Sequence, residues 1–246
     1  MSRKISVLGG ILMLASLGGA AAPPALAQDA SDETELGPVF LLALGGKLYD
    51  DLWTILDELP PEERNSAISG ALSVSRRDSW RCVTCHGWDY SGATVEGKEF
   101  PGLTGLVDAD PEIVRGRLRD PAHPFPADRL SDTAMDILAL FVTQGQYARN
   151  DYISESDVAV GNPEFGRDIF EGACISCHQL DGRRYLKGET GDRSSLGWVS
   201  RNRPEQAIHK ILNGVPAAEM LSLRFLSDIQ VADLLAYLQS LDPNEK

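Results

Sequence analysis

Cysteine and histidine are scarce in this sequence, with four of each among 246 residues. Basic side chains are outnumbered, since 23 Lys and Arg stand against 36 Asp and Glu and leave a formal net charge of −13. This acidic balance argues against nucleic acid as a partner. No phosphate-binding loop and no carboxylate pair with a discernible substrate site is present, so no catalytic residue is predicted. The apolar content of 43% and the charged content of 24% exclude disordered and fibrous classes.

Long apolar runs are rare, and the one that stands out lies near the N-terminus. Arg3 and Lys4 precede an apolar run over residues 5–17, and small residues follow as far as Ala27. The run is shorter than the roughly 20 residues that span a bilayer. It therefore predicts a cleavable signal peptide over residues 1–27, with an uncleaved membrane anchor as the alternative. We expect a periplasmic mature protein without a membrane span, whose formal net charge falls from −13 to −15 when Arg3 and Lys4 are removed.

All four cysteines lie in two copies of one pentad, in which two residues separate a pair of cysteines and a histidine follows directly. The copies contain Cys82, Cys85 and His86, and Cys174, Cys177 and His178. This spacing is the pattern for covalent haem attachment, in which both thiols form thioethers with haem vinyl groups and the histidine ligates the iron. A thioredoxin-like redox pair, a zinc site with four thiolates and two disulfides are the alternatives, but none explains the histidine after both pairs. The sequence therefore predicts two haem c groups.

Residues 161–246 resemble a class I cytochrome c domain. A helix expected over residues 163–172 leads into the second pentad, and in this family a small residue such as Gly166 lets that helix cross the C-terminal helix closely. Another helix is expected over residues 204–212. The C-terminal helix begins with a capping box, Ser227 with Gln230, and continues with apolar residues at helical spacing.

Residues 28–150 repeat this plan less closely. A Leu-Ser-Asp sequence at residues 130–132 matches the one at residues 226–228, which predicts a second C-terminal helix ending near Gly145. Pro111 is expected to begin another helix, as Pro204 does in the second half.

The departure from the plan lies before the first pentad. A helix over residues 39–59 that contains Gly45 is expected to replace the usual N-terminal helix, with residues 60–78 as an insertion. The resemblance therefore implies an all-α fold of two class I cytochrome c-like domains, each around a covalently bound haem, with an N-terminal helical extension. The predicted boundaries are residues 28–150 for the first domain, 151–160 for a linker and 161–246 for the second domain.

The position of a histidine at the end of each pentad predicts two of the axial iron ligands. His86 and His178 are the expected proximal ligands, because each ends a pentad. The resemblance places Met220 as the distal ligand of the second haem, with core packing as the alternative. His123 precedes its Leu-Ser-Asp sequence by nearly the same number of residues as Met220 precedes the other, so His123 is the expected distal ligand of haem 1. Met135 and an open iron remain the alternatives.

The fourth histidine, His209, lies within the helix expected over residues 204–212 and is interpreted as structural, with a hydrogen bond to a haem propionate as a further possibility. A bis-histidine haem 1 and a histidine–methionine haem 2 would differ in potential, because a methionine ligand generally raises it. Electrons are therefore expected to enter at haem 1 and leave from haem 2.

The whole chain resembles the two-domain dihaem cytochromes, which implies an electron carrier with redox proteins as partners. The acidic charge predicts a partner with a basic docking face, with solubility alone as the alternative. One alternative is a peroxidase-like dihaem enzyme in which His123 leaves its iron. Another is the cytochrome subunit or electron acceptor of a periplasmic dehydrogenase, docked through Leu41, Leu42, Leu52 and Trp53. The alternative for these four residues is core packing against the haem domain. The catalytic site of dihaem thiosulfate dehydrogenases, which needs a cysteine on the iron, is excluded because both pentads use every cysteine.

Overall fold

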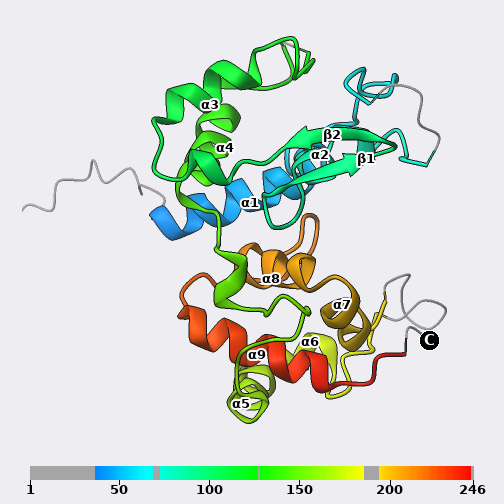
Figure 1. Ribbon diagram of the computed structural model, residues 1–246, viewed down its shortest axis with the longest axis vertical. Helices are drawn as coiled ribbons and strands as arrows, with labels where there is room; N and C mark the ends of the chain where they lie inside the picture. The colour runs from blue at the N-terminus through cyan, green and yellow to red at the C-terminus, as the bar shows by residue number, and fades with distance from the viewer. Residues whose placement is uncertain (1–36, 69–72, 127, 186–193, 245–246) are drawn as a thin grey trace, which may run out of the picture. The chain divides into compact units, whose positions relative to one another are not determined.

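The computed structural model describes residues 37–68, 73–126, 128–185 and 194–244, and the predicted signal peptide lies outside them. The α-helices and strands in these ranges are labelled in Figure 1, and three short 3₁₀ helices, η1 to η3, accompany them. The elements are α1 (Pro38–Ile55), η1 (Asp78–Trp80), α2 (Cys82–His86), β1 (Gly92–Val95), β2 (Lys98–Pro101), η2 (Thr104–Leu106), α3 (Pro111–Leu118), α4 (Asp132–Gln144), η3 (Arg149–Asp151), α5 (Pro163–Ala173), α6 (Ile175–His178), α7 (Leu196–Asn202), α8 (Pro204–Asn213) and α9 (Asp228–Ser240).

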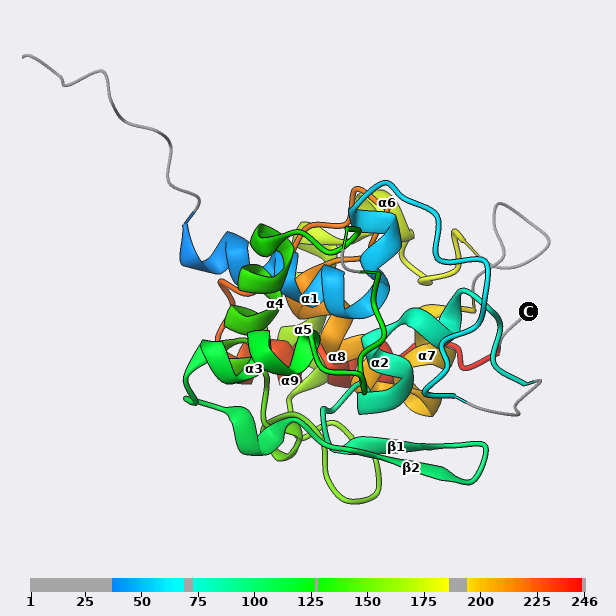
Figure 2. The ribbon, with the colours of Figure 1, turned by 90° about the horizontal axis from the view of Figure 1, so that it is seen from above.

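Two pairs of packed helices organise the structure, α5 with α9 and α1 with α4. Figure 2 shows the second pair side by side. Each pair has a glycine at its closest approach. A Cβ atom added at Gly166 would lie 1.9 Å from the Asp233 carbonyl oxygen, and one at Gly45 would lie 2.4 Å from the Phe141 Cβ. Both helix contacts therefore require a residue without a side chain.

The helices begin where the sequence provides caps. The predicted capping box at the start of α9 is confirmed, because Ser227 accepts a hydrogen bond from the Gln230 backbone while the Gln230 side chain binds the Ser227 backbone. Ser131 caps α4 in the same way through the Ala134 N–H. The helices expected over residues 163–172 and 204–212 are confirmed as α5 and α8. α7 has no counterpart among the predicted helices.

The N-terminal helix is shorter than the predicted residues 39–59, because α1 ends at Ile55. The backbone of Asp51 is already non-helical, at φ −151° and ψ 88°. Its carboxylate accepts hydrogen bonds from the Thr54 N–H and from the Arg77 guanidinium. These local contacts compete with the helical hydrogen-bond pattern and bend the last turn.

The fold is helix-rich, and one β-hairpin that was not predicted follows the first pentad. β1 and β2 pair antiparallel, with Val95 opposite Lys98. The two residues between them, Glu96 and Gly97, have φ values of 51° and 83°. Positive φ at both turn positions is what a tight type I′ hairpin requires.

The segment predicted as a linker packs into the core. Tyr152 and Ile153 are buried, and Ile153 forms an isolated β-bridge with Ala159. A single hydrophobic cluster contains residues from both halves, such as Leu48 and Leu235, within the compact unit Leu36–Lys246. Among the described residues, no helix is long and apolar enough to cross a membrane.

Candidate functional site

The first pentad forms the short helix α2, and its ends are held by neighbouring elements. Before it, Arg81 donates a hydrogen bond of 2.6 Å to the Asp50 carbonyl oxygen and forms an ion pair with the Asp50 carboxylate. After it, Gly87 ends the helix with φ +77° and accepts a hydrogen bond of 2.6 Å from the Tyr49 hydroxyl. α1 therefore fixes both ends of the pentad.

The imidazole of His86 is oriented by the hairpin. Its Nδ1 lies 2.8 Å from the Pro101 carbonyl oxygen at the end of β2. A carbonyl can only accept, so Nδ1–H donates and Nε2 keeps its lone pair. Burial lowers the pKa of His86, which also favours the neutral ring. Second-shell bonds of this kind fix the tautomer and the orientation of metal-ligating histidines.

His123 lies in the loop between α3 and α4, and the structure brings it next to His86. The two ring centres are 6.0 Å apart and the ring planes differ by 24°. On its other side, His123 stacks on Phe125 at 6.5 Å and 9°. Burial lowers the pKa of His123, and its Nδ1 is buried without a hydrogen-bond partner. The two imidazoles therefore approach one another from different elements.

His123 opens into a cavity of about 520 Å³ that is also lined by Phe125, Leu130 and Met135. Met135 comes from α4 and is buried in the core. Both candidate distal ligands of haem 1 therefore lie in the wall of one cavity, but the ring contact to His86 is made by His123.

The pair of histidines has the spacing that an axially ligated iron needs. An imidazole nitrogen lies about 2 Å from the metal that it ligates, so two imidazoles on opposite sides of one ion have ring centres roughly 6 Å apart. The observed distance of 6.0 Å between the two ring centres matches this spacing. Cys82 and Cys85 lie on the same helix as His86, so the first site fits a haem c group.

The thiols argue against the other roles of paired cysteines. None of the four is in a disulfide. Burial raises the pKa of Cys82 to about 12 and those of Cys85 and Cys174 to about 11, whereas a thioredoxin-like pair needs a depressed thiol pKa. The described residues contain no group of three or more His, Cys, Asp or Glu that could hold a metal ion.

The second pentad continues directly from α5, because Cys174 is both the C-cap residue of α5 and the N-cap residue of α6. Gln179 follows α6 with φ +62°, the same left-handed conformation that Gly87 adopts after α2. The ring of His178 is half-buried and meets Tyr185 edge-on at 5.7 Å. The two pentads thus share a helix–turn geometry.

Met220 lies in the loop between α8 and α9. This loop is tied to α8 by the Leu223 N–H, which donates to Ile211, and by the Ser222 hydroxyl, which donates to Leu212. Met220 is half-buried.

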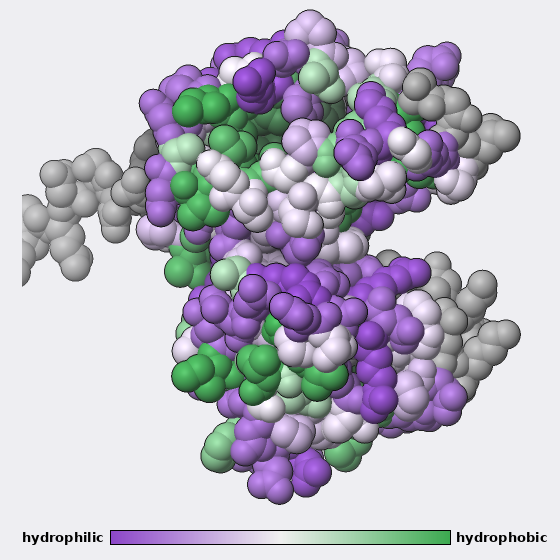
Figure 3. Space-filling view, viewed as in Figure 1, coloured by the Kyte–Doolittle hydropathy of each residue, from purple (hydrophilic) through white to green (hydrophobic). Residues whose placement is uncertain are grey.

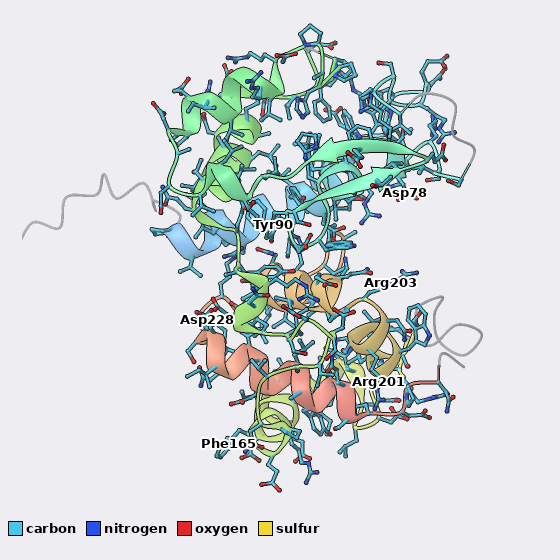
Figure 4. The ribbon with its side chains drawn as sticks, in the orientation of Figure 1. Asp78, Tyr90, Phe165, Arg201, Arg203 and Asp228 are labelled. Atoms are coloured by element: carbon cyan, nitrogen blue, oxygen red, sulfur yellow. The ribbon has the colours of Figure 1, made fainter. Side chains whose placement is uncertain are left out.

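His209 is fully buried and both of its ring nitrogens are used inside the protein. Nε2 lies 3.0 Å from the Gly46 carbonyl oxygen, and Nδ1 lies 3.0 Å from the hydroxyl of Tyr90, which Figure 4 labels. The carbonyl accepts, so Nε2–H donates and Nδ1 accepts the tyrosine proton. Burial lowers the pKa of His209 to about 4. The structural interpretation of His209 agrees with this arrangement, and a propionate bond does not.

Sequence reasoning missed two contributors to this site, the Pro101 carbonyl and Tyr90. Both belong to residues 87–101, where a Val-Glu-Gly-Lys sequence between residues with β propensity was the available signal for a hairpin. Tyr90 packs edge-on against Tyr49 at 5.4 Å and against Tyr147 at 5.3 Å. The loop after the first pentad is therefore part of the core.

Comparison with protein families identifies residues 164–242 as matching the family model described as Cytochrome c. No curated protein matches the chain. The family match supports a haem electron-transfer protein with covalently bound haem c in this domain and with redox proteins as partners.

Proposed function

We propose that the protein is a periplasmic electron carrier with two covalently bound haem c groups. The observation that carries the proposal beyond residues 164–242 is the ring pair of His86 and His123, 6.0 Å apart beside Cys82 and Cys85. The first pentad, with both a proximal and a distal imidazole, gives haem 1 the ligands that a six-coordinate iron needs.

The proposed ligands are His86 and His123 for haem 1, and His178 and Met220 for haem 2. When bound, the haem groups supply reversible one-electron chemistry, and the protein sets their potentials through the axial ligands. Methionine ligation raises the potential of haem 2, so the proposed direction is from haem 1 to haem 2. Six-coordinate iron at both sites leaves no open position for a substrate, which favours a carrier over a peroxidase.

The proposed location and partner follow from the signal sequence and the charge. A mature formal charge of −15 suits a redox partner with a basic docking face. Hydrophilic residues predominate on the face in Figure 3, with a few apolar patches between them. Such a surface is typical of transient partners rather than of a large obligate interface.

The ligand assignment is tested by low-temperature EPR and near-infrared magnetic circular dichroism of the oxidised protein. We expect the wild type to give one bis-histidine and one histidine–methionine signal. The change His123→Ala should alter the bis-histidine signal alone, because it removes the ring next to His86. Met135→Leu is the matched control in the same cavity and should leave both signals unchanged.

Three results would contradict parts of this proposal. A high-spin haem in the wild type would indicate an open iron and return attention to the peroxidase alternative. Loss of a signal in Met135→Leu with none in His123→Ala would make Met135 the distal ligand. A haem content of one per chain, measured as pyridine haemochrome, would overturn the dihaem assignment itself.

A further inference from the structure

A buried carboxylate lies where the two halves of the chain pack together. Asp50 is on α1, and its side chain is only 2% exposed. It accepts a hydrogen bond of 2.6 Å from the ammonium group of Lys210 on α8, and it forms an ion pair with Arg81, the residue before Cys82. α8 packs against α1, as Figure 1 shows. A cation from the second half is therefore held beside the first pentad.

Trp88 holds both cations from the other end of the pentad. Its ring centre lies 5.7 Å from the guanidinium carbon of Arg81 and 5.2 Å from the ammonium nitrogen of Lys210. Both distances are within the range of a cation–π interaction. Trp88 follows His86 by two residues. The charged cluster, as we call Asp50, Arg81 and Lys210, therefore borders the pentad both before its first cysteine and after its histidine.

The charged cluster is close enough to act on a group that is attached at Cys82. Burial is the main cause of the raised pKa of this thiol, and two nearby charges add to it in opposite directions, Asp50 raising the pKa and Arg81 lowering it. Burial also raises the pKa of the Asp50 carboxyl, but Lys210 and Arg81 more than offset this, so the pKa lies below its ordinary value and Asp50 is ionised. Because a thioether at Cys82 joins the proposed haem 1 to the chain, the same charges act on that haem.

The pair of Asp50 and Lys210 is shielded from solvent. Lys210 is 20% exposed, whereas Asp78, a second carboxylate bonded to Arg81, is 45% exposed. Solvent and salt screen exposed charges much more strongly than buried ones. Stability alone does not account for a buried ion pair, because its replacement by apolar residues is often neutral or stabilising. An effect on redox chemistry gives these buried charges a role.

We propose that Asp50 and Lys210 set the reduction potential of the haem at the first pentad, Asp50 lowering it and Lys210 raising it. The inference rests on the proposed dihaem function and adds the control of one potential to it. The oxidised haem carries one more positive charge than the reduced haem, so a nearby anion favours the oxidised form and a nearby cation disfavours it. Neither residue is a ligand, and both act through their charge. Because Lys210 lies on α8, the second half of the chain takes part in setting the potential of haem 1.

The test is a potentiometric titration of the dihaem protein, followed by near-infrared magnetic circular dichroism, which separates a bis-histidine haem from a histidine–methionine haem. A unit charge roughly 10 Å from a redox centre changes its reduced-to-oxidised ratio on the order of tenfold at an effective dielectric constant of about 20. In Asp50→Asn, we therefore expect this ratio for haem 1, at a fixed applied potential, to rise roughly tenfold, equivalent to about 59 mV. In Lys210→Gln, the ratio should fall roughly threefold, because this charge is the more exposed of the two.

Shifts of opposite sign distinguish an effect of charge from an effect of packing, because a loss of packing has no reason to raise the potential in one variant and lower it in the other. Lys210→Arg keeps the charge and should keep most of the wild-type potential. A double variant with Asp50→Asn and Lys210→Gln should give a ratio between those of the two single variants.

Arg203→Gln is the matched control, because it removes a cation from the exposed N-cap residue of the same helix, which Figure 4 labels, and it should leave haem 1 unchanged. Shifts of the same sign in Asp50→Asn and Lys210→Gln would overturn the inference while leaving the proposed function intact. So would unchanged potentials in both, or an equal shift in Arg203→Gln. If Asp50→Asn does not accumulate with haem, an unchanged haem 1 potential in Lys210→Gln would by itself overturn the inference. A single haem per wild-type chain would instead overturn the proposed function.

Discussion

The change Gly166→Ala is expected to lower the free energy of unfolding by about 3 kcal/mol, at the upper end of the usual cost of overpacking. The added Cβ would lie 1.9 Å from the Asp233 carbonyl oxygen and 2.9 Å from the Tyr237 Cβ. The first contact is with backbone, so no side-chain rotation can relieve it, and α5 and α9 must move apart. Denaturant unfolding of the holoprotein, followed by far-UV circular dichroism, measures the loss.

Gly172 provides the matched control within α5. Nothing lies within 4 Å of a Cβ added there, so Gly172→Ala should stabilise the protein by about 0.5–1 kcal/mol through helix propensity alone. Equal effects of the two changes would show that the contact of α5 with α9 is looser than described. Gly45→Ala extends the test to α1, because its Cβ would meet Phe141 at 2.4 Å. A neutral effect there would contradict a shared helix-packing plan in the two halves.

The helices of this fold could be predicted because their signals are local. The capping box of Ser227 and Gln230 and the spacing of apolar residues mark α9, and the same Leu-Ser-Asp sequence marks α4. The glycines at the helix contacts could be predicted only through the family resemblance. A glycine is needed at such a position because a residue far away in the sequence packs against it, as Asp233 packs against Gly166.

The closeness of His86 and His123 could be predicted from the sequence, but the groups that support them could not. Spacing from the Leu-Ser-Asp sequence placed His123 opposite Met220, and the structure places the His123 ring 6.0 Å from that of His86. The Pro101 carbonyl contributes through its backbone, so no side-chain pattern reveals it.

The stability of the protein is expected to fall as the pH is lowered from 7 to 5, with a large part of the loss due to His209. Burial lowers the pKa of this residue to about 4 in the folded state, whereas an unfolded histidine has a pKa of about 6.5. Between these values the unfolded chain binds a proton that the folded chain does not, so acid favours unfolding. The contribution is about 2 kcal/mol between pH 7 and pH 5 and approaches about 3 kcal/mol below pH 4. Above pH 7 it is absent.

The change His209→Gln isolates this contribution, because the amide can still donate to the Gly46 carbonyl oxygen but cannot titrate. The variant should be less stable than the wild type at pH 7 by about 1–2 kcal/mol and should lose much less on acidification, so the two curves of unfolding free energy against pH converge near pH 5. Tyr90→Phe is the control, since it removes the partner of Nδ1 without removing the titrating ring, and it should keep the wild-type slope. Parallel curves for wild type and His209→Gln would show that the imidazole has the same pKa in the folded and the unfolded protein. A wild type that instead gains stability relative to the variant as the pH falls from 7 to 5 would show that the buried imidazole is already protonated at pH 7. The Nε2–H···O bond to α1 would then be charge-assisted, and His209 would join α8 to α1 as a cation beside Asp50.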